Sequence, residues 1–130
     1  MMSAYGEILD YDDIKFIKNA MLDKNTTQFR GMSFERKYYE GKAFYSYQTQ
    51  IAFLNYSTGV LEIALDWFDC SSTTRTQFSK WLYANSYVPY TTVKKTAKKV
   101  RRELEKMYIP EPTGEIFEDA ETGTLYSFVF

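Results

Sequence analysis

The chain has 130 residues, of which 45% are hydrophobic and 25% charged, and its formal net charge is -1. This length suits a single domain over residues 1–130, and the composition is that of a globular chain rather than an intrinsically disordered one. The sequence contains neither the apolar run of about 20 residues that spans a membrane nor a signal-peptide pattern at its start, so we expect a soluble, cytoplasmic protein without membrane contact.

A helix is predicted for the first patterned segment, residues 10–22. Asp10 stands at the cap position, and two further acids follow where the positive end of the helix dipole favours them. Four apolar residues lie near one face of this helix: Tyr11, Ile14, Ile17 and Met21.

Residues 29–67 change from a period near 3.6 to a period of two, which is typical of strands. The turn "YEGK" separates "FRGMSFERKYY" from "AFYSYQTQIAFLNY", and we expect these two runs to form a hairpin. Gly59 is placed for a second turn, and "VLEIALDWF" then alternates as the clearest strand of the chain.

Two helices are predicted next. The first runs from about Thr74 to Ala84, with Thr74 and Gln77 as a capping box and Phe78, Trp81 and Leu82 as its buried stripe. The second covers residues 92–107, and its apolar residues repeat at intervals of three and four: Val93, Ala97, Val100, Leu104 and Met107.

The last segment, "EIFEDAETGTLYSFVF", predicts a hairpin with Gly123 in the turn and with Leu125, Phe128 and Phe130 available for burial. The expected fold class is therefore α+β. It is a mostly antiparallel β-meander with about three helices packed on it.

The predicted helix 92–107 is unusually basic. Seven basic residues against two acids give the segment between Val93 and Met107 a charge of +5, so the rest of the chain carries -6. Three interpretations of these basic residues remain open: a solvated surface, a contact for an acidic protein or nucleic acid, or a site for small anions. We place Lys94 and Lys95 in the first helical turn, where the helix dipole disfavours cations. Because stability alone would favour acids there, this placement favours binding of an anion. The candidate contact residues are Lys94, Lys95, Lys98, Lys99, Arg101 and Arg102.

Catalytic chemistry has little support in the sequence. There is no histidine, so Cys70 lacks the usual base that would hold its thiolate, and a single cysteine forms no internal disulfide. Asp66 and Asp69 are too few for a convincing cation site and are better explained as capping residues. We expect no catalytic residue, no metal and no cofactor.

Aromatic residues make up 18% of the chain, including twelve tyrosines. Protein interfaces favour tyrosine because it joins a large apolar ring to a polar tip, although small β-rich cores also use aromatic rings as volume. Tyr45 and Tyr47 are therefore added to the candidate contact residues.

The stretch from Tyr45 to Leu82, "YSYQTQIAFLNYSTGVLEIALDWFDCSSTTRTQFSKWL", resembles a pattern in small uncharacterised proteins of bacteriophages and mobile elements. Such proteins often carry a histidine after the "TT", where this chain has Arg75, Thr76 and Gln77, and any chemistry of that histidine is lost here. The resemblance implies a phage accessory protein, a class that often inhibits host enzymes or defence systems and that includes anti-CRISPR proteins.

Two functional hypotheses follow. The first is a non-enzymatic phage or mobile-element protein that binds and inhibits a host macromolecule, with a nuclease or nucleoprotein complex such as a CRISPR effector as the candidate partner. The alternative is a nucleic-acid-binding accessory protein that places the basic helix 92–107 on phosphates.

Overall fold

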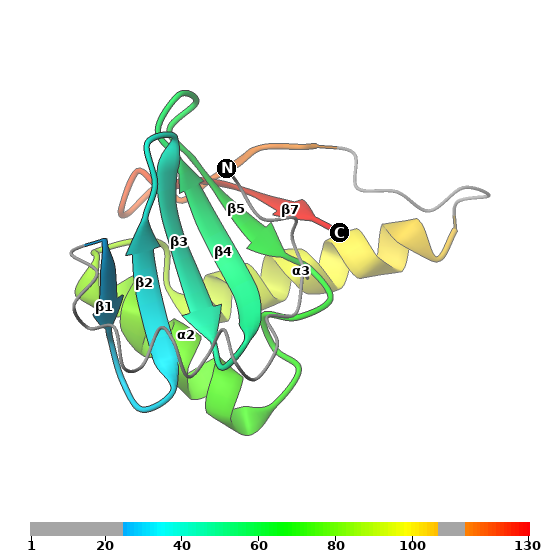
Figure 1. The fold of residues 1–130 in the computed structure, drawn as a ribbon. Helices are drawn as coiled ribbons and strands as arrows, with labels where there is room; N and C mark the ends of the chain where they lie inside the picture. Colours follow the sequence, from blue (N-terminus) through cyan, green and yellow to red (C-terminus); the bar gives the residue numbers. More distant parts are fainter. Residues whose placement is uncertain (1–24, 107–113) are drawn as a thin grey trace.

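The computed structural model describes residues 25–106 and 114–130 (Figure 1). These residues form seven strands and two helices, in the order β1 (Thr26–Gln28), β2 (Ser33–Lys37), β3 (Gly41–Ser46), β4 (Thr49–Asn55), β5 (Val60–Ala64), α2 (Ser72–Ala84), α3 (Tyr90–Leu104), β6 (Phe117–Glu118) and β7 (Leu125–Val129). The helix predicted for residues 10–22, and Met107 at the end of the predicted basic helix, lie outside the described residues.

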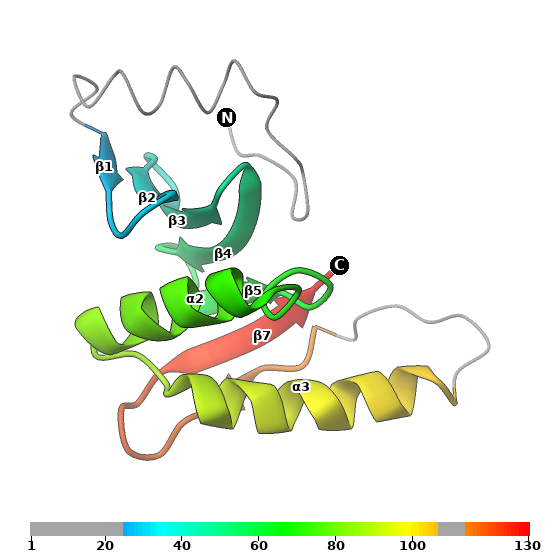
Figure 2. The same cartoon turned by 90° about the horizontal axis from the view of Figure 1, so that it is seen from below.

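All seven strands belong to one sheet with the order β1-β2-β3-β4-β5-β7-β6. Every neighbouring pair is antiparallel except β5 and β7, which are parallel. The chain between these two strands contains both helices, which lie on the same face of the sheet (Figure 2). The predicted α+β class and antiparallel meander are confirmed, and the described part of the chain contains two of the roughly three helices expected.

The run "AFYSYQTQIAFLNY", expected as one strand, is two strands joined by a tight turn at Tyr47 and Gln48. Tyr47 has a φ of 54°, a left-handed conformation that is uncommon outside glycine and asparagine. The register between β3 and β4 also shifts at Phe44 and Tyr45, so Ile51 is the extra residue of a bulge. The expectation failed because the alternation of apolar residues continues through a turn that carries no glycine or proline.

The main core lies between the sheet and the two helices. Phe44 of β3 stacks on Trp81 of α2 with ring centroids 4.8 Å apart, and Phe78 stacks against the same phenylalanine at 5.9 Å. Phe78, Trp81 and Leu82 are all completely buried, which confirms the predicted stripe. Helix α2 is therefore held mainly by aromatic packing on the centre of the sheet.

The predicted capping box of α2 is wrong, because the helix begins two residues earlier. Ser71 is the N-cap, and its hydroxyl accepts a hydrogen bond from the backbone N–H of Thr74. The Thr74 and Gln77 side chains instead point into the protein, where both bond the hydroxyl of Ser46 at 2.9 and 2.6 Å. Three buried polar groups thus satisfy one another between β3 and α2.

The C-terminal hairpin is confirmed, with Gly123 in its turn at a φ of 74°. Phe128 is buried, whereas Leu125 is half-buried and Phe130 is exposed. Strand β5 lies inside the sheet between β4 and β7, and β7 pairs with it in parallel, a pairing that the alternation of β5 did not predict. The core consequently extends further along the chain than a meander alone would give.

Substitution of Gly41 tests the close contact between β3 and β4. A Cβ atom at this position would lie 2.1 Å from the carbonyl oxygen of Leu54 and 2.4 Å from the Phe53 ring. We expect Gly41→Ala to lower the free energy of unfolding by about 2 kcal/mol or more, since overpacking of a rigid site typically costs about 1–3 kcal/mol. Urea titration measures the loss, and Glu40→Ala in the same turn is the control. Equal stability of both variants would refute the contact.

Candidate functional site: the basic face of helix α3

Helix α3 begins at Tyr90, directly after Pro89, two residues earlier than predicted. Lys94 and Lys95 therefore lie in the second helical turn rather than the first. The repulsion expected from the helix dipole fades beyond the first turn, so the predicted dipole penalty at these lysines is wrong. The case for an anionic partner has to rest on the exposed charges themselves.

The apolar edge of α3 is seated as predicted. Val93 and Ala97 are completely buried in the main core, and Val100 and Leu104 pack against it while half-buried. Because these residues recur every three or four positions, they fix the rotation of the helix about its axis. The opposite side of α3 is turned to solvent.

Five cations occupy that outer side, and we call them the α3 basic face. At about 100° per residue they fall within an arc of about 140° centred almost opposite the apolar edge. All five are exposed, and none forms an ion pair with another residue that the structure describes. The α3 basic face consists of Lys94, Lys95, Lys98, Lys99 and Arg102.

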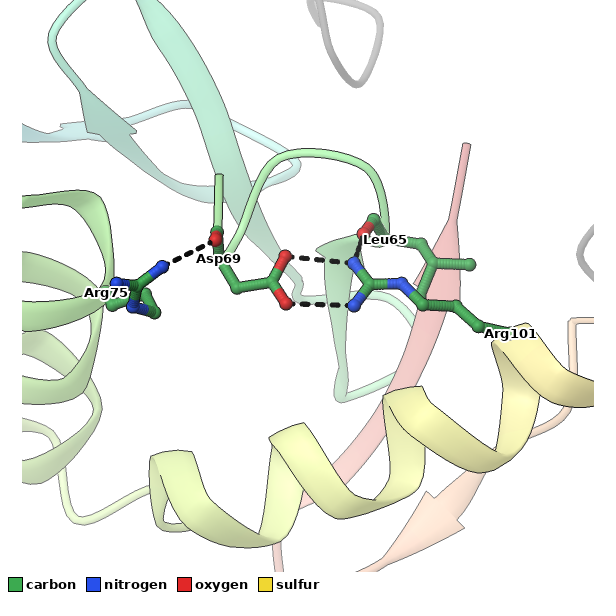
Figure 3. Close-up of polar contacts among 4 residues, drawn as sticks. All are labelled: Leu65, Asp69, Arg75 and Arg101. Atoms are coloured by element: carbon green, nitrogen blue, oxygen red, sulfur yellow. Dashed lines mark hydrogen bonds and ion pairs between the residues drawn. The ribbon is translucent and has the colours of Figure 1, made fainter. Parts of the chain in front are cut away.

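Arg101 is the exception among the predicted contact residues, because a carboxylate of the protein neutralises it. Its guanidinium donates two parallel hydrogen bonds to Asp69, at 2.8 and 2.9 Å, and a third to the carbonyl oxygen of Leu65 (Figure 3). The guanidinium also lies over the Phe68 ring, 5.2 Å from its centroid. Arg101 thus ties α3 to the loop between β5 and α2.

The same loop is held from the other side by α2. Arg75 donates a hydrogen bond of 3.2 Å to the backbone carbonyl of Asp69 (Figure 3). Asp69 therefore contacts both helices, one through its side chain and one through its backbone. This explains why the loop between β5 and α2 keeps its position beside α3.

The electrostatics of the pair agree with its geometry. The hydrogen bond from Arg101 is the largest cause that lowers the pKa of Asp69, and the bond to Asp69 correspondingly raises the pKa of Arg101. Burial raises the pKa of Tyr90, and the negative charge of Asp69 adds to that effect. Both members of the pair are charged at neutral pH.

A groove of about 420 Å³ runs between α3 and this loop. Its walls carry three cations of the α3 basic face, while the Asp69–Arg101 pair supplies an internally neutral section and Glu105 a single acid. The groove is therefore net positive. Its lining residues are Asp69, Lys94, Lys98, Arg101, Arg102 and Glu105.

The two aspartates considered as capping or cation-binding groups do neither. Ser71 caps α2, Asp69 is engaged by Arg101, and Asp66 is exposed. Among the described residues, no group of three or more acidic, cysteine or histidine side chains is placed to hold a metal ion. Cys70 is exposed at the start of α2, with its sulfur 3.9 Å from the Thr74 hydroxyl.

The two tyrosines proposed as contacts have different surroundings. Tyr45 is only 2% exposed and belongs to a second apolar cluster with Phe34, Ala43 and Phe53. Its hydroxyl lies 2.9 Å from that of Tyr38, so Tyr45 is a core residue and not a contact residue. Tyr47 is 46% exposed at the turn between β3 and β4 and remains available at the surface.

Comparison of the chain with protein-family models, curated proteins and solved structures finds no match. Within the residues that the structure describes, no helix has the length and apolar character to cross a membrane. The site must therefore be interpreted from its own geometry.

Removal of the Asp69 charge tests the contact between α3 and the loop. We expect Asp69→Asn to lower the free energy of unfolding by about 1 kcal/mol at pH 7, a discounted value because the Arg101 side chain is 38% exposed. The folded-state pKa of Asp69 is lowered, so its contribution is present above the unfolded value near 4 and lost as the pH falls through the folded value.

Chemical denaturation of both proteins across this pH range measures the difference, which should shrink below about pH 4. Asp66→Asn is the matched control, since that residue is exposed and forms no ion pair with another described residue, and it should cost less stability at pH 7 than Asp69→Asn. A pH-independent difference between wild type and Asp69→Asn would contradict an ionic contribution.

Proposed function

We propose that the chain is a non-enzymatic binding protein that docks on an anionic macromolecule through the α3 basic face. The observation that carries this proposal is the presence of five exposed cations on one side of a single helix, without ion-pair partners among the described residues. A rigid helix seated on a core presents them together, and such a patch attracts and orients a partner of opposite charge.

The pattern of charge within the helix supports a role in binding over a role in stability. Lys94 and Lys98, and likewise Lys95 and Lys99, are four residues apart, so like charges face each other along the helix surface. Like charges at this spacing destabilise a helix by about 0.2–0.5 kcal/mol per pair, whereas an acid four residues from each lysine would stabilise it. These repulsive pairs lie on the solvent side of α3, where binding of an anion would relieve the repulsion.

A binding role without catalysis fits the remaining chemistry. The chain has no histidine, the carboxylate of Asp69 is committed to Arg101, and the exposed Cys70 has only the hydroxyl of Thr74 as its described side-chain partner. A nucleophile or general base would need a neighbour that shifts its pKa toward neutrality. The pKa of Asp69 is instead lowered, away from neutrality.

We extend the proposal to a phage or mobile-element protein that inhibits a host macromolecule, with a nuclease or nucleoprotein complex such as a CRISPR effector as the candidate target. The resemblance over Tyr45 to Leu82 supports this extension, and the α3 basic face supplies a contact for an acidic or phosphate-bearing surface. Occlusion of that surface is the mechanism we propose, since it requires affinity and no chemistry.

Charge reversal on the helix tests the docking surface. Capture from a bacterial host lysate on immobilised protein, followed by mass spectrometry, should enrich a partner that is lost when Lys95→Glu and Lys98→Glu are combined. Reversal of two central cations turns attraction into repulsion, so a loss of at least about tenfold in captured partner is expected.

The matched control combines Lys37→Glu and Lys80→Glu, two exposed lysines of β2 and α2 that give the same change in net charge elsewhere. This control should retain the partner. Equal loss in both double variants would indicate a general effect of charge, and equal capture by wild type and the α3 variant would refute docking through α3.

A further inference from the structure

We infer that the occupant of the α3 basic face is the phosphodiester backbone of double-stranded nucleic acid, contacted without reading of the bases. This inference rests on the proposed function and names the partner class for the same surface. Three features of the face support it: most of its cations are lysines, it has no exposed apolar side chain among the described residues, and its cations are spaced like phosphates along a strand.

An acidic protein fits the surface less well, because the surface has no apolar anchor. Stable protein interfaces centre on buried aromatic or aliphatic side chains and are depleted in lysine. In the described residues, the exposed large apolar side chains belong to turns, to α2 and to the C-terminal segment, and none belongs to α3. Four of the five members of the α3 basic face are lysines.

Recognition of carboxylates would also favour arginine. A guanidinium forms two parallel hydrogen bonds with a planar carboxylate, whereas a lysine ammonium acts as a point charge that needs no particular orientation. Of the two arginines that line the groove, Arg101 is already bound to Asp69, which leaves Arg102 beside four lysines. The remaining cations suit a repeating anion such as the phosphodiester backbone.

The spacing of the cations agrees with a backbone contact. From Lys94 to Arg102 the helix rises about 12 Å, at about 1.5 Å per residue. Over about the same length a duplex strand carries three to four phosphates, at about 3.4 Å of axis per phosphate. Two parallel rows of cations, Lys94–Lys98 and Lys95–Lys99, therefore match one segment of strand, with the groove beside the first row.

A single strand or a membrane surface fits less well than a duplex. Proteins that bind single strands stack bases on exposed aromatic rings, and helices that lie on membranes insert apolar side chains. Neither kind of side chain is exposed on α3 in the described structure. A lysine-rich helix laid against a duplex needs only phosphates, which carry no sequence information.

The Asp69–Arg101 pair limits the positive charge of the surface. Because Asp69 neutralises Arg101, five cations rather than six remain to meet phosphates. Each phosphate neutralised contributes about -0.9 to the slope of log affinity against log salt. The expected slope is about -4.5, which corresponds to an affinity loss of about 500-fold between about 50 and about 200 mM salt.

The experiment is a fluorescence anisotropy titration of a labelled short DNA duplex of scrambled sequence with the full chain across this salt range. We expect binding at low salt, a slope near -4.5, and the same affinity for a second duplex of different sequence. Lys95→Ala and Lys98→Ala should each reduce the magnitude of the slope by about 1. Lys37→Ala and Lys80→Ala are the controls and should leave it unchanged.

Asp69→Asn gives a test in the opposite direction. Removal of this carboxylate releases the charge of Arg101 into the groove, so duplex affinity should rise and the slope should steepen by about 1. Asp66→Asn, which changes the net charge equally at an exposed position outside the groove lining, should have a smaller effect. Weaker binding by Asp69→Asn would overturn the assignment of the groove.

Three other outcomes would overturn the inference: no binding to duplex at about 50 mM salt, tighter binding to the matching single strand, or tighter binding to vesicles of anionic lipid. If the duplex is not bound but the α3 charge reversal still abolishes capture of a lysate protein, the inference fails and the proposed function stands. If that capture also survives the reversal, both fail.

Discussion

The bond between Asp69 and Arg101 is the constraint on which the arrangement of the basic surface depends. Burial of Val93 and Ala97, with Val100 and Leu104 packed beside them, seats α3 on the core and sets its rotation. The guanidinium fork, with its additional bond to Leu65, fixes a second point eight residues after Val93. Arg75 holds the backbone of the same aspartate from α2, so one loop residue orients both helices. The apolar edge turns the exposed cations outward, and the bond adds a tether between α3 and the loop.

The same bond also sets the balance of charge. It places a carboxylate in the wall of the groove next to Lys94 and Lys98, where an isolated acid would repel an anion, and neutralises that acid with Arg101. The segment from Val93 to Met107 carries +5 on a chain whose other residues sum to -6. On the proposed function, this concentration of positive charge on one helix favours a single orientation of approach by a polyanion.

Local patterns predicted the described helices and most strands, while the cap of α2, the start of α3 and the contacts between distant residues were missed. The spacing from Val93 to Leu104 predicted both the α3 helix and its outward cations, and alternation predicted β5. Nothing in the sequence marks the turn at Tyr47, because a tyrosine with positive φ is held there by the surrounding sheet. The Asp69–Arg101 contact spans 32 residues. One signal in the sequence pointed to it: on a helix, Arg101 lies at the margin of the apolar edge, next to Val100, where a charge is half-buried and needs a partner.

The aromatic surplus shows why composition alone overstated the case for a protein interface. Phe44, Phe78 and Trp81 form the centre of the main core, and Tyr45 lies in the second cluster with its hydroxyl bonded to that of Tyr38. A buried tyrosine whose tip is satisfied behaves as core volume. The rings therefore explain the stability of the sheet and its helices. The surface property that still requires an explanation is the set of lysines on α3 that have no ion-pair partner among the described residues. On the proposed function, charge, more than apolar area, is the basis on which this protein selects a partner.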